Sequence, residues 1–284
     1  MAWALRYASH LGYRTSNAPL FRESVGSLDP LAHVTFAAEL GFAGVQYALA
    51  RSRPIAEQNA VAAALARYGL ETGCVIYTTR EKLAAPLWGT TDAEARAVLN
   101  CELVAGFETA KRVNSRYLAV LSGADPRLPI GEQRDAMAEN LSWAAPLAER
   151  AGITLLLESI STRSVANLLL HHIEDAHAMV KAVDSPAVRL IFDTGHVQAM
   201  DGDVLAHLDS CWDVIELVQI ADNPHRLEPG AGEINFETIL RELYRRTYHG
   251  LVELEHNWSE PSRTTEQRGI AYLRRLDELA GSTS

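Results

Sequence analysis

Short apolar runs alternate with longer amphipathic segments along the whole chain. Most of these runs are four to six residues long and apolar nearly throughout; they are Leu5–Ser9, Gly44–Ala48, Thr72–Tyr77, Tyr117–Leu121, Thr154–Glu158, Val188–Asp193, Glu216–Ala221 and Leu251–Glu255. Parallel strands that are buried on both faces have this pattern, because neither face is left for polar residues. The pattern therefore predicts eight buried parallel strands.

The segments between the runs carry helix signals. Asp29 with Pro30 can begin a helix that Gly41 ends, and Thr91 with Glu94 has capping-box spacing. A helix over 131–150 should stop at Gly152, and Pro146 is expected to kink or split it. Further helices are expected over Leu170–Val183, Val204–Cys211, Phe236–Arg245 and Thr265–Leu279.

Eight strands, each followed by a helix, favour one closed (β/α)8 TIM barrel over an open sheet, because a barrel exposes no edge strand. We expect a single α/β domain that covers residues 1–284, since no Ser/Gly/Pro-rich linker divides the chain. The long segments 10–29 and 78–90 follow the first and third strands. In this fold both should lie over the catalytic face.

Composition narrows the class of protein. The formal net charge of −10 opposes non-specific binding to nucleic acid or to an anionic membrane. The three widely separated cysteines predict reduced thiols rather than disulfides or a zinc knuckle. Neither a signal peptide nor an apolar run of 18 residues is present, so we expect a cytoplasmic protein with a small-molecule substrate.

Polar residues end four neighbouring strands: Glu158, Asp193, Gln219 and Glu255. The carboxyl ends of barrel strands converge at one rim, where three carboxylates would raise one another's pKa values. A divalent cation removes that conflict, and an oxygen-donor set suits Mg²⁺ or Mn²⁺ better than zinc. The sequence therefore predicts a metal site formed by these four side chains.

Each of these residues has a structural alternative. Glu158 could cap the following helix, Asp193 could be a turn residue, Gln219 could be a satisfied core amide, and His196 alone would more often be structural. On the last strand, Glu253 and Glu255 point to the same side because they are two residues apart. Glu255 is nearer the rim and is taken as the ligand, whereas Glu253 is expected to be a deeper acid that pairs with Arg189.

Several segments together resemble a known family. They are AAELGFAGVQY (37–47), NLLLH (167–171), FDTGHVQAMDGD (192–203), VQIADNPHRLEPGAGEINF (218–236) and GLVELEH (250–256). They are similar to the hydroxypyruvate isomerase family of xylose-isomerase-like barrels, most strongly from about residue 150 to 258. Gln219 favours this branch over the ketose 3-epimerases, which have His at the matching position.

The resemblance implies a metal-dependent isomerase. Glu158, Asp193, Gln219 and Glu255 would be its Mg²⁺ or Mn²⁺ ligands, and Glu158 and Glu255 its two proton-transfer carboxylates. His196 and Arg226 would contact the substrate's oxygens. Hydroxypyruvate would become tartronate semialdehyde, or a related sugar acid would react in the same way. The resemblance also implies that copies of the chain can assemble as a homo-oligomer.

The chain departs from the family pattern at ESIS (158–161), His225, EHNW (255–258) and the segment 76–89, which leaves the substrate open. A ketose 3-epimerase on the same barrel is the nearest alternative. A metal-dependent DNA-repair endonuclease would need extra histidines and a basic face. A non-catalytic binding barrel would not need the acidic strand ends.

Overall fold

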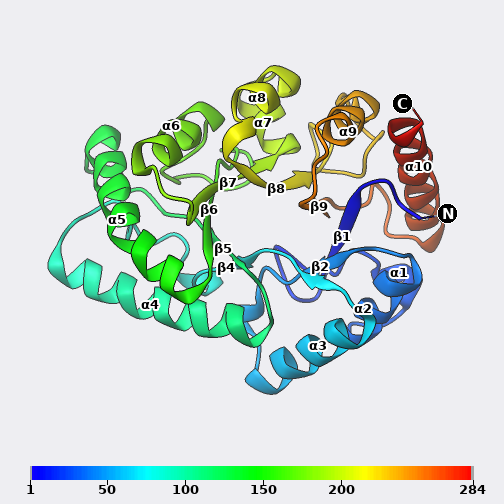
Figure 1. The fold of residues 1–284 in the computed structure, drawn as a ribbon, viewed down its shortest axis with the longest axis horizontal. Helices are drawn as coiled ribbons and strands as arrows, with labels where there is room; N and C mark the ends of the chain where they lie inside the picture. Colours follow the sequence, from blue (N-terminus) through cyan, green and yellow to red (C-terminus); the bar gives the residue numbers. More distant parts are fainter. Residues whose placement is uncertain (1, 283–284) are drawn as a thin grey trace.

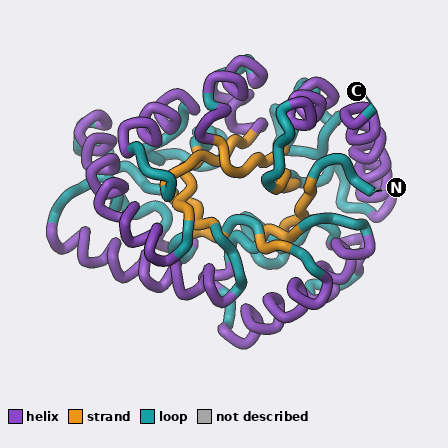
Figure 2. The backbone as a smooth tube through the Cα atoms, in the orientation of Figure 1, coloured by secondary structure: helices purple, strands orange, loops and turns teal. Residues whose placement is uncertain are grey.

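The chain forms a ring of parallel strands surrounded by helices, in a computed structural model that describes residues 2–282 (Figure 1). The strands lie inside and the helices outside, as the tube in Figure 2 shows. The strands are β1 (Arg6–His10), β2 (Gly44–Gln46), β3 (Glu71–Thr72), β4 (Val75–Ile76), β5 (Tyr117–Val120), β6 (Thr154–Glu158), β7 (Val188–Asp193), β8 (Ile215–Ile220) and β9 (Leu251–Leu254). Their order is β3-β2-β1-β9-β8-β7-β6-β5-β4, and all pairs are parallel.

The two strands at the ends of this order are consecutive in the chain. The third predicted strand, Thr72–Tyr77, is interrupted at Gly73 and Cys74, so that β3 pairs with β2 while β4 pairs with β5. The interrupted strand therefore closes the sheet, and the prediction of one α/β barrel is confirmed apart from this break.

Ten α-helices surround the sheet in the described residues. They are α1 (Arg22–Val25), α2 (Pro30–Glu39), α3 (Ile55–Tyr68), α4 (Ala93–Arg112), α5 (Ile130–Ala151), α6 (Ile173–Val183), α7 (Thr194–Met200), α8 (Val204–Ser210), α9 (Phe236–Arg245) and α10 (Arg263–Gly281). Within this part of the chain, no helix is both long and apolar enough to span a membrane.

The helix ends confirm some predictions and correct others. Asp29 caps α2 by accepting the Leu31 N–H, as expected. The cap of α4 is Asp92 and not Thr91, because the Asp92 carboxylate accepts the N–H groups of Glu94 and Ala95. Pro146 does not split α5, which runs unbroken to Ala151.

Strand residues alternate between the two faces of the sheet. In β6, Leu155 and Leu157 pack in the main core against the helices, whereas Leu156 points into the barrel. Leu156, Ile191 and Leu217 share this interior cluster. Because side chains two apart share a face, Glu158, Asp193 and Gln219 lie on the same interior face as these three residues, one step nearer the rim.

Candidate active site

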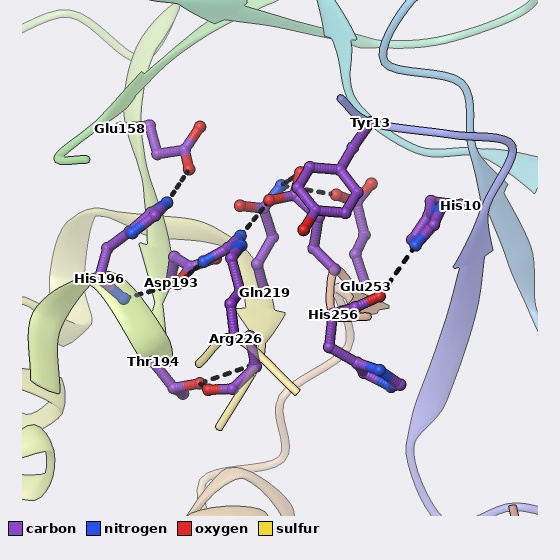
Figure 3. A network of polar contacts seen from close by, with 12 residues as sticks. His10, Tyr13, Glu158, Asp193, Thr194, His196, Gln219, Arg226, Glu253 and His256 are labelled. Carbon is purple, nitrogen blue, oxygen red and sulfur yellow. Dashed lines mark hydrogen bonds and ion pairs between the residues drawn. The ribbon is translucent and has the colours of Figure 1, made fainter. Parts of the chain in front are cut away.

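The four polar strand ends meet on the interior face at the carboxyl rim. Asp193 pairs in register with Gln219, and Gln219 pairs with Glu253, two residues before Glu255. All four predicted side chains are more than nine-tenths buried. They lie on one rim, but the group whose ligand atoms lie within 4.8 Å of one another consists of Glu158, Asp193 and His196 and does not include Glu255. Figure 3 shows Glu158, Asp193 and Gln219 near Arg226.

Arg226 lies at the centre of this group (Figure 3). Its guanidinium donates to Asp193 Oδ1 at 3.0 Å and to Asp193 Oδ2 at 2.7 Å, and it also donates to Glu255 Oε2. The side chain is 8% exposed, so both ion pairs are buried. In this state the guanidinium neutralises two of the predicted metal ligands, and its donors are engaged with them rather than open to a substrate.

The loop that presents Arg226 is held by a carboxylate. Asp222 accepts the N–H groups of Gly230, Gly232 and Ile234. Arg226 itself has a positive φ of 56°. The EPGAGEIN segment therefore shapes a turn, as the sequence suggested, and the turn points the arginine into the barrel.

Asp193 has two functions. Besides binding Arg226, its carboxylate accepts the His196 N–H at 2.8 Å and so caps α7. Burial raises the pKa of Asp193, but the charge and hydrogen bonds of Arg226, together with His196 and its backbone N–H, lower it more and hold that pKa below its usual range. Asp193 is therefore a helix-cap residue, as the structural alternative held, and it is also part of the site.

Glu158 is different, because it caps nothing. No described residue donates a hydrogen bond to its carboxylate, and the cap of α6 is His172, so the helix-cap alternative is wrong. The nearest partner is His196, with Nε2 at 3.8 Å from Glu158 Oε1. Burial, together with the charges of Glu255 and Asp193, raises the pKa of Glu158 well above its ordinary value.

His196 is buried and uncharged. Burial, helped by the positive charge of Arg226, lowers the pKa of His196 to about 3. A neutral imidazole can donate one hydrogen bond while its other nitrogen accepts. At neutral pH the ring is therefore available as a hydrogen-bond donor toward Glu158 or toward an oxygen bound beside it.

Two side-chain amides bind the two carboxylates at the carboxyl end of the last strand. Gln46 Nε2 donates to Glu253 Oε2 at 2.8 Å and to Glu255 Oε1 at 2.7 Å, and Gln219 Nε2 donates to the same two oxygens at 2.9 and 3.2 Å. Glu253 and Glu255 thus point the same way, as predicted. The expected pair with Arg189 is wrong, because that guanidinium donates to the Asp213 carbonyl oxygen.

Glu253 fills the gap in the interrupted strand. Its Oε1 accepts the Cys74 N–H at 2.7 Å, between β3 and β4. A side chain at Gly73 would be excluded, since a Cβ there would lie 2.0 Å from Glu253 Oε1. Burial raises the pKa of Glu253 to about 8, although the donors from Gln219 and Cys74 oppose this rise.

The donor set can be tested against a divalent cation. One ligand atom from each of Glu158, Asp193 and His196 lies within 4.8 Å of the others. The Gln219 Oε1 atom is buried and has no hydrogen-bond partner, although buried acceptors are normally satisfied. A divalent cation can use such a free amide oxygen together with carboxylate oxygens, so the residues fit the expected group.

Charge balance points the same way. Glu158, Asp193 and Glu255 carry three negative charges when ionised, and Arg226 supplies one positive charge, which leaves −2. Uncompensated buried charge is costly, so either a divalent cation or protons must balance it. Burial raises the pKa values of Glu158, Glu253 and Glu255, so proton uptake by these buried acids is the alternative to a cation.

A cavity of about 340 Å³ opens above these groups, and Glu158, His196, Arg226 and Glu255 all line it. Segments 10–29 and 78–90, expected over the catalytic face, supply the lining residues Tyr13, Arg14, Arg80, Leu83 and Ala84. Figure 3 shows the Tyr13 ring beside Arg226, whose Cζ is 5.4 Å from the ring centroid.

Sequence reasoning did not single out Gln46 or Tyr13. Gln46 carried a usable signal, because it is a polar residue inside the apolar strand GVQYALA (44–50), as Gln219 is in IELVQI. Tyr13 carried none, since a tyrosine in a long loop has no periodicity that places it. His196 was expected only to contact substrate, and its distances also allow it to serve as a ligand.

Fold and site together define a barrel enzyme with an acidic, cation-compatible rim. The family model for the xylose isomerase-like TIM barrel matches residues 34–276, and the chain belongs to that family. It is 29% identical to hydroxypyruvate isomerase of Escherichia coli (strain K12), over 85% of this chain and 92% of the relative. It is 29% identical to 2-oxo-tetronate isomerase of Pectobacterium atrosepticum, over 79% and 89%.

A solved structure titled AP endonuclease, family 2, from Brucella melitensis superposes with a TM-score of 0.80 at 25% identity, covering 95% of this chain and 98% of that one. The curated relatives above are named as isomerases, and this chain is an isomerase as well.

Proposed function

We propose that this isomerase moves a carbonyl group between adjacent carbons of a 3-hydroxy-2-oxo acid, with a divalent metal, Mg²⁺ or Mn²⁺, bound at the rim. The observation that carries the proposal is that Glu158 and Glu255, two buried carboxylates, line one cavity. The printed names of the two relatives, hydroxypyruvate isomerase and 2-oxo-tetronate isomerase, support a 2-oxo acid as the substrate class.

Glu158, Asp193, Gln219 and Glu255 are the proposed metal ligands, and His196 lies close enough to join them. When bound, the cation would act as a Lewis acid that acidifies the C–H bond on C3, the hydroxyl-bearing carbon next to the carbonyl. Arg226 already balances Asp193 and Glu255, so loading the site requires its guanidinium to give up at least part of these contacts.

Glu158 is the proposed base for the C3 proton. It has no hydrogen-bond donor that would hold its lone pairs, and burial raises its pKa, which makes the ionised carboxylate a stronger base. Neutral His196, whose Nε2 is 3.8 Å from Glu158 Oε1, would donate a hydrogen bond to the oxygen that becomes negative. Removal of the proton gives an enediolate.

Glu255 is the proposed acid on the other side. Gln46, Gln219 and Arg226 fix its two oxygens, so its direction is set. Protonation of the enediolate at C2 completes the carbonyl shift, and hydroxypyruvate would give tartronate semialdehyde in this way. Return of a proton to the original carbon from the opposite face would instead give epimerisation.

The test is a screen of C3–C6 hydroxy-carbonyl compounds in deuterated water with Mn²⁺ or Mg²⁺ added. Isomerisation places deuterium on C2, next to the carbon that lost the proton, whereas epimerisation places it back on C3, from which the proton was removed. We expect Glu158→Gln and Glu255→Gln each to lower the rate roughly 10²–10⁴-fold. Glu132→Gln, on the exposed side of α5, is the matched control. Full activity in either site variant would refute the assignment.

A further inference from the structure

The cavity has two chemically different sides. The reactive groups come from β6 to β9 and the loop after β8, whereas the opposite side is formed by β4, β5 and the segments after β2, β4 and β6. That side is lined largely by aliphatic side chains: Leu49, Ile76, Leu83, Leu121, Ile160 and Leu168. The substrate therefore meets carboxylates at one end and hydrocarbon at the other.

The aliphatic side is not simply the edge of the main core. Leu121, Ile160 and Leu168 form a small cluster of their own, and Leu83 packs both against this cluster and against the main core. All four line the cavity. Apolar side chains that line a binding cavity favour a ligand that buries hydrocarbon surface against them.

A polyhydroxylated substrate would be poorly matched to this side. Among the described lining residues there, hydrogen-bonding side chains are confined to Cys74 at the barrel interior, exposed Arg80 and half-exposed Ser164. Hydroxyl groups placed against leucine and isoleucine would lose their water partners without gaining others, which is unfavourable.

The volume is also larger than a three-carbon acid needs. One molecule of liquid water occupies about 30 Å³, so about 340 Å³ corresponds to roughly eleven waters. Hydroxypyruvate would fill the acidic end and leave the aliphatic side in contact with water.

We infer that the substrate carries an apolar group of about three to five carbons beyond its reactive centre, so that it is a 3-hydroxy-2-oxo acid of the form R–CH(OH)–CO–COO⁻ with an aliphatic R. This inference rests on the proposed function for the reactive end. The reaction stays internally balanced: the C3 proton leaves, the C2–C3 enediolate forms, a proton returns to C2, and the proton of the C3 hydroxyl passes to the C2 oxygen, which gives R–CO–CH(OH)–COO⁻. No oxidant or reductant is consumed.

Binding of unreactive analogues tests the inference without any turnover. Pyruvate, 2-oxobutanoate, 2-oxopentanoate and 2-oxohexanoate lack the 3-hydroxyl group and cannot isomerise by this route. Calorimetric titration of the Mn²⁺-supplemented protein should show the Kd falling about fourfold with each added methylene, the factor expected for burying one such group. A Kd that is flat or rises along the series would overturn the inference.

Two variants localise the effect. Leu83→Gln should reduce the gain per methylene, because Leu83 packs on the aliphatic cluster and is only partly buried, so the chain should still fold. Leu128→Gln, at an exposed leucine outside the cavity, should keep the wild-type slope. Equal slopes in the two variants would also overturn the inference.

Turnover then separates the two proposals. The acids with R as hydrogen, hydroxymethyl and propyl are compared by kcat/KM from deuterium incorporation, and the propyl compound should be preferred. If none exchanges while the analogue series still shows its slope, the proposed function fails and the aliphatic subsite stands. If the first two react and are preferred over the propyl acid, the proposed function stands and the aliphatic subsite fails.

Discussion

Replacing Arg226 with alanine removes the guanidinium that Asp193 and Glu255 share. Both carboxylates stay buried in the variant, because the strand ends that carry them are unchanged. Removing one partner of a buried ion pair leaves an uncompensated charge, which costs about 3–5 kcal/mol. At roughly 2–4 °C per kcal/mol for a domain of about this size, Tm should fall by roughly 6–20 °C at neutral pH.

The loss should depend on pH in a definite direction. In the wild type, Arg226 holds the pKa of Asp193 below its usual range, so this stabilisation is present above the unfolded-state pKa and is lost only as pH falls through the lower folded-state value. In the variant, burial and the Glu255 charge remain, and both raise the pKa of Asp193. The variant is therefore destabilised relative to the wild type at high pH. This loss of stability disappears as the carboxyl groups of Asp193 and Glu255 take up protons.

Thermal unfolding from pH 5 to 8, followed by circular dichroism with a chelator present, measures this directly. The difference in Tm between wild type and Arg226→Ala should be largest near pH 8 and should shrink toward pH 5. Arg127→Ala is the control, since its ion pair with Asp125 involves a side chain that is 85% exposed and should leave Tm unchanged. A gap that does not change with pH would refute the assignment of charge at the rim.

Three further outcomes are expected. Gly73→Ala should destabilise the protein by about 1–3 kcal/mol in chemical denaturation, because the new Cβ would collide with the carboxylate of Glu253. Gly131→Ala is the control and should not destabilise it, since a Cβ there would meet nothing within 4 Å. Equal free energies of unfolding for the two variants would contradict this packing. Glu102→Gln should weaken the contacts to Thr78, Lys82 and Arg51 and make segment 78–90 cleave faster in limited proteolysis than in the exposed Glu108→Gln variant. Mn²⁺ at 100 times its Kd should stabilise the wild type by about 2.7 kcal/mol, seen as a higher Tm that a chelator reverses; an unchanged Tm would count against the proposed cation site.

The sequence predicted the barrel well because its strands are buried on both faces, which leaves a clear apolar signal. The strand ends followed from the same pattern, since Glu158, Asp193 and Gln219 each interrupt an apolar run at its carboxyl end. The break at Gly73 could not be seen this way, because Thr72–Tyr77 reads as one continuous apolar run. The reason for the break is the carboxylate of Glu253, which comes from a strand about 180 residues away in the chain.

The partners of charged residues were the least predictable part. Glu253 was assigned to Arg189, but Arg189 lies on β7, which β8 separates from β9, and its guanidinium donates to the Asp213 carbonyl oxygen. Arg226 was expected to contact the substrate, whereas its guanidinium binds the carboxylates of Asp193 and Glu255, and its backbone has a positive φ. Such loop geometry depends on contacts that Asp222 makes up to twelve residues later, which no local periodicity records.

The interrupted third strand has a consequence for observing this protein. The amide of Cys74 is satisfied by a side chain, Glu253, rather than by the backbone of an adjacent strand. Its hydrogen–deuterium exchange should therefore respond to anything that moves this one carboxylate, while amides in the continuous strands report only on opening of the barrel. The exchange rate of this one amide thus reports on the position of the Glu253 carboxylate without any attached probe.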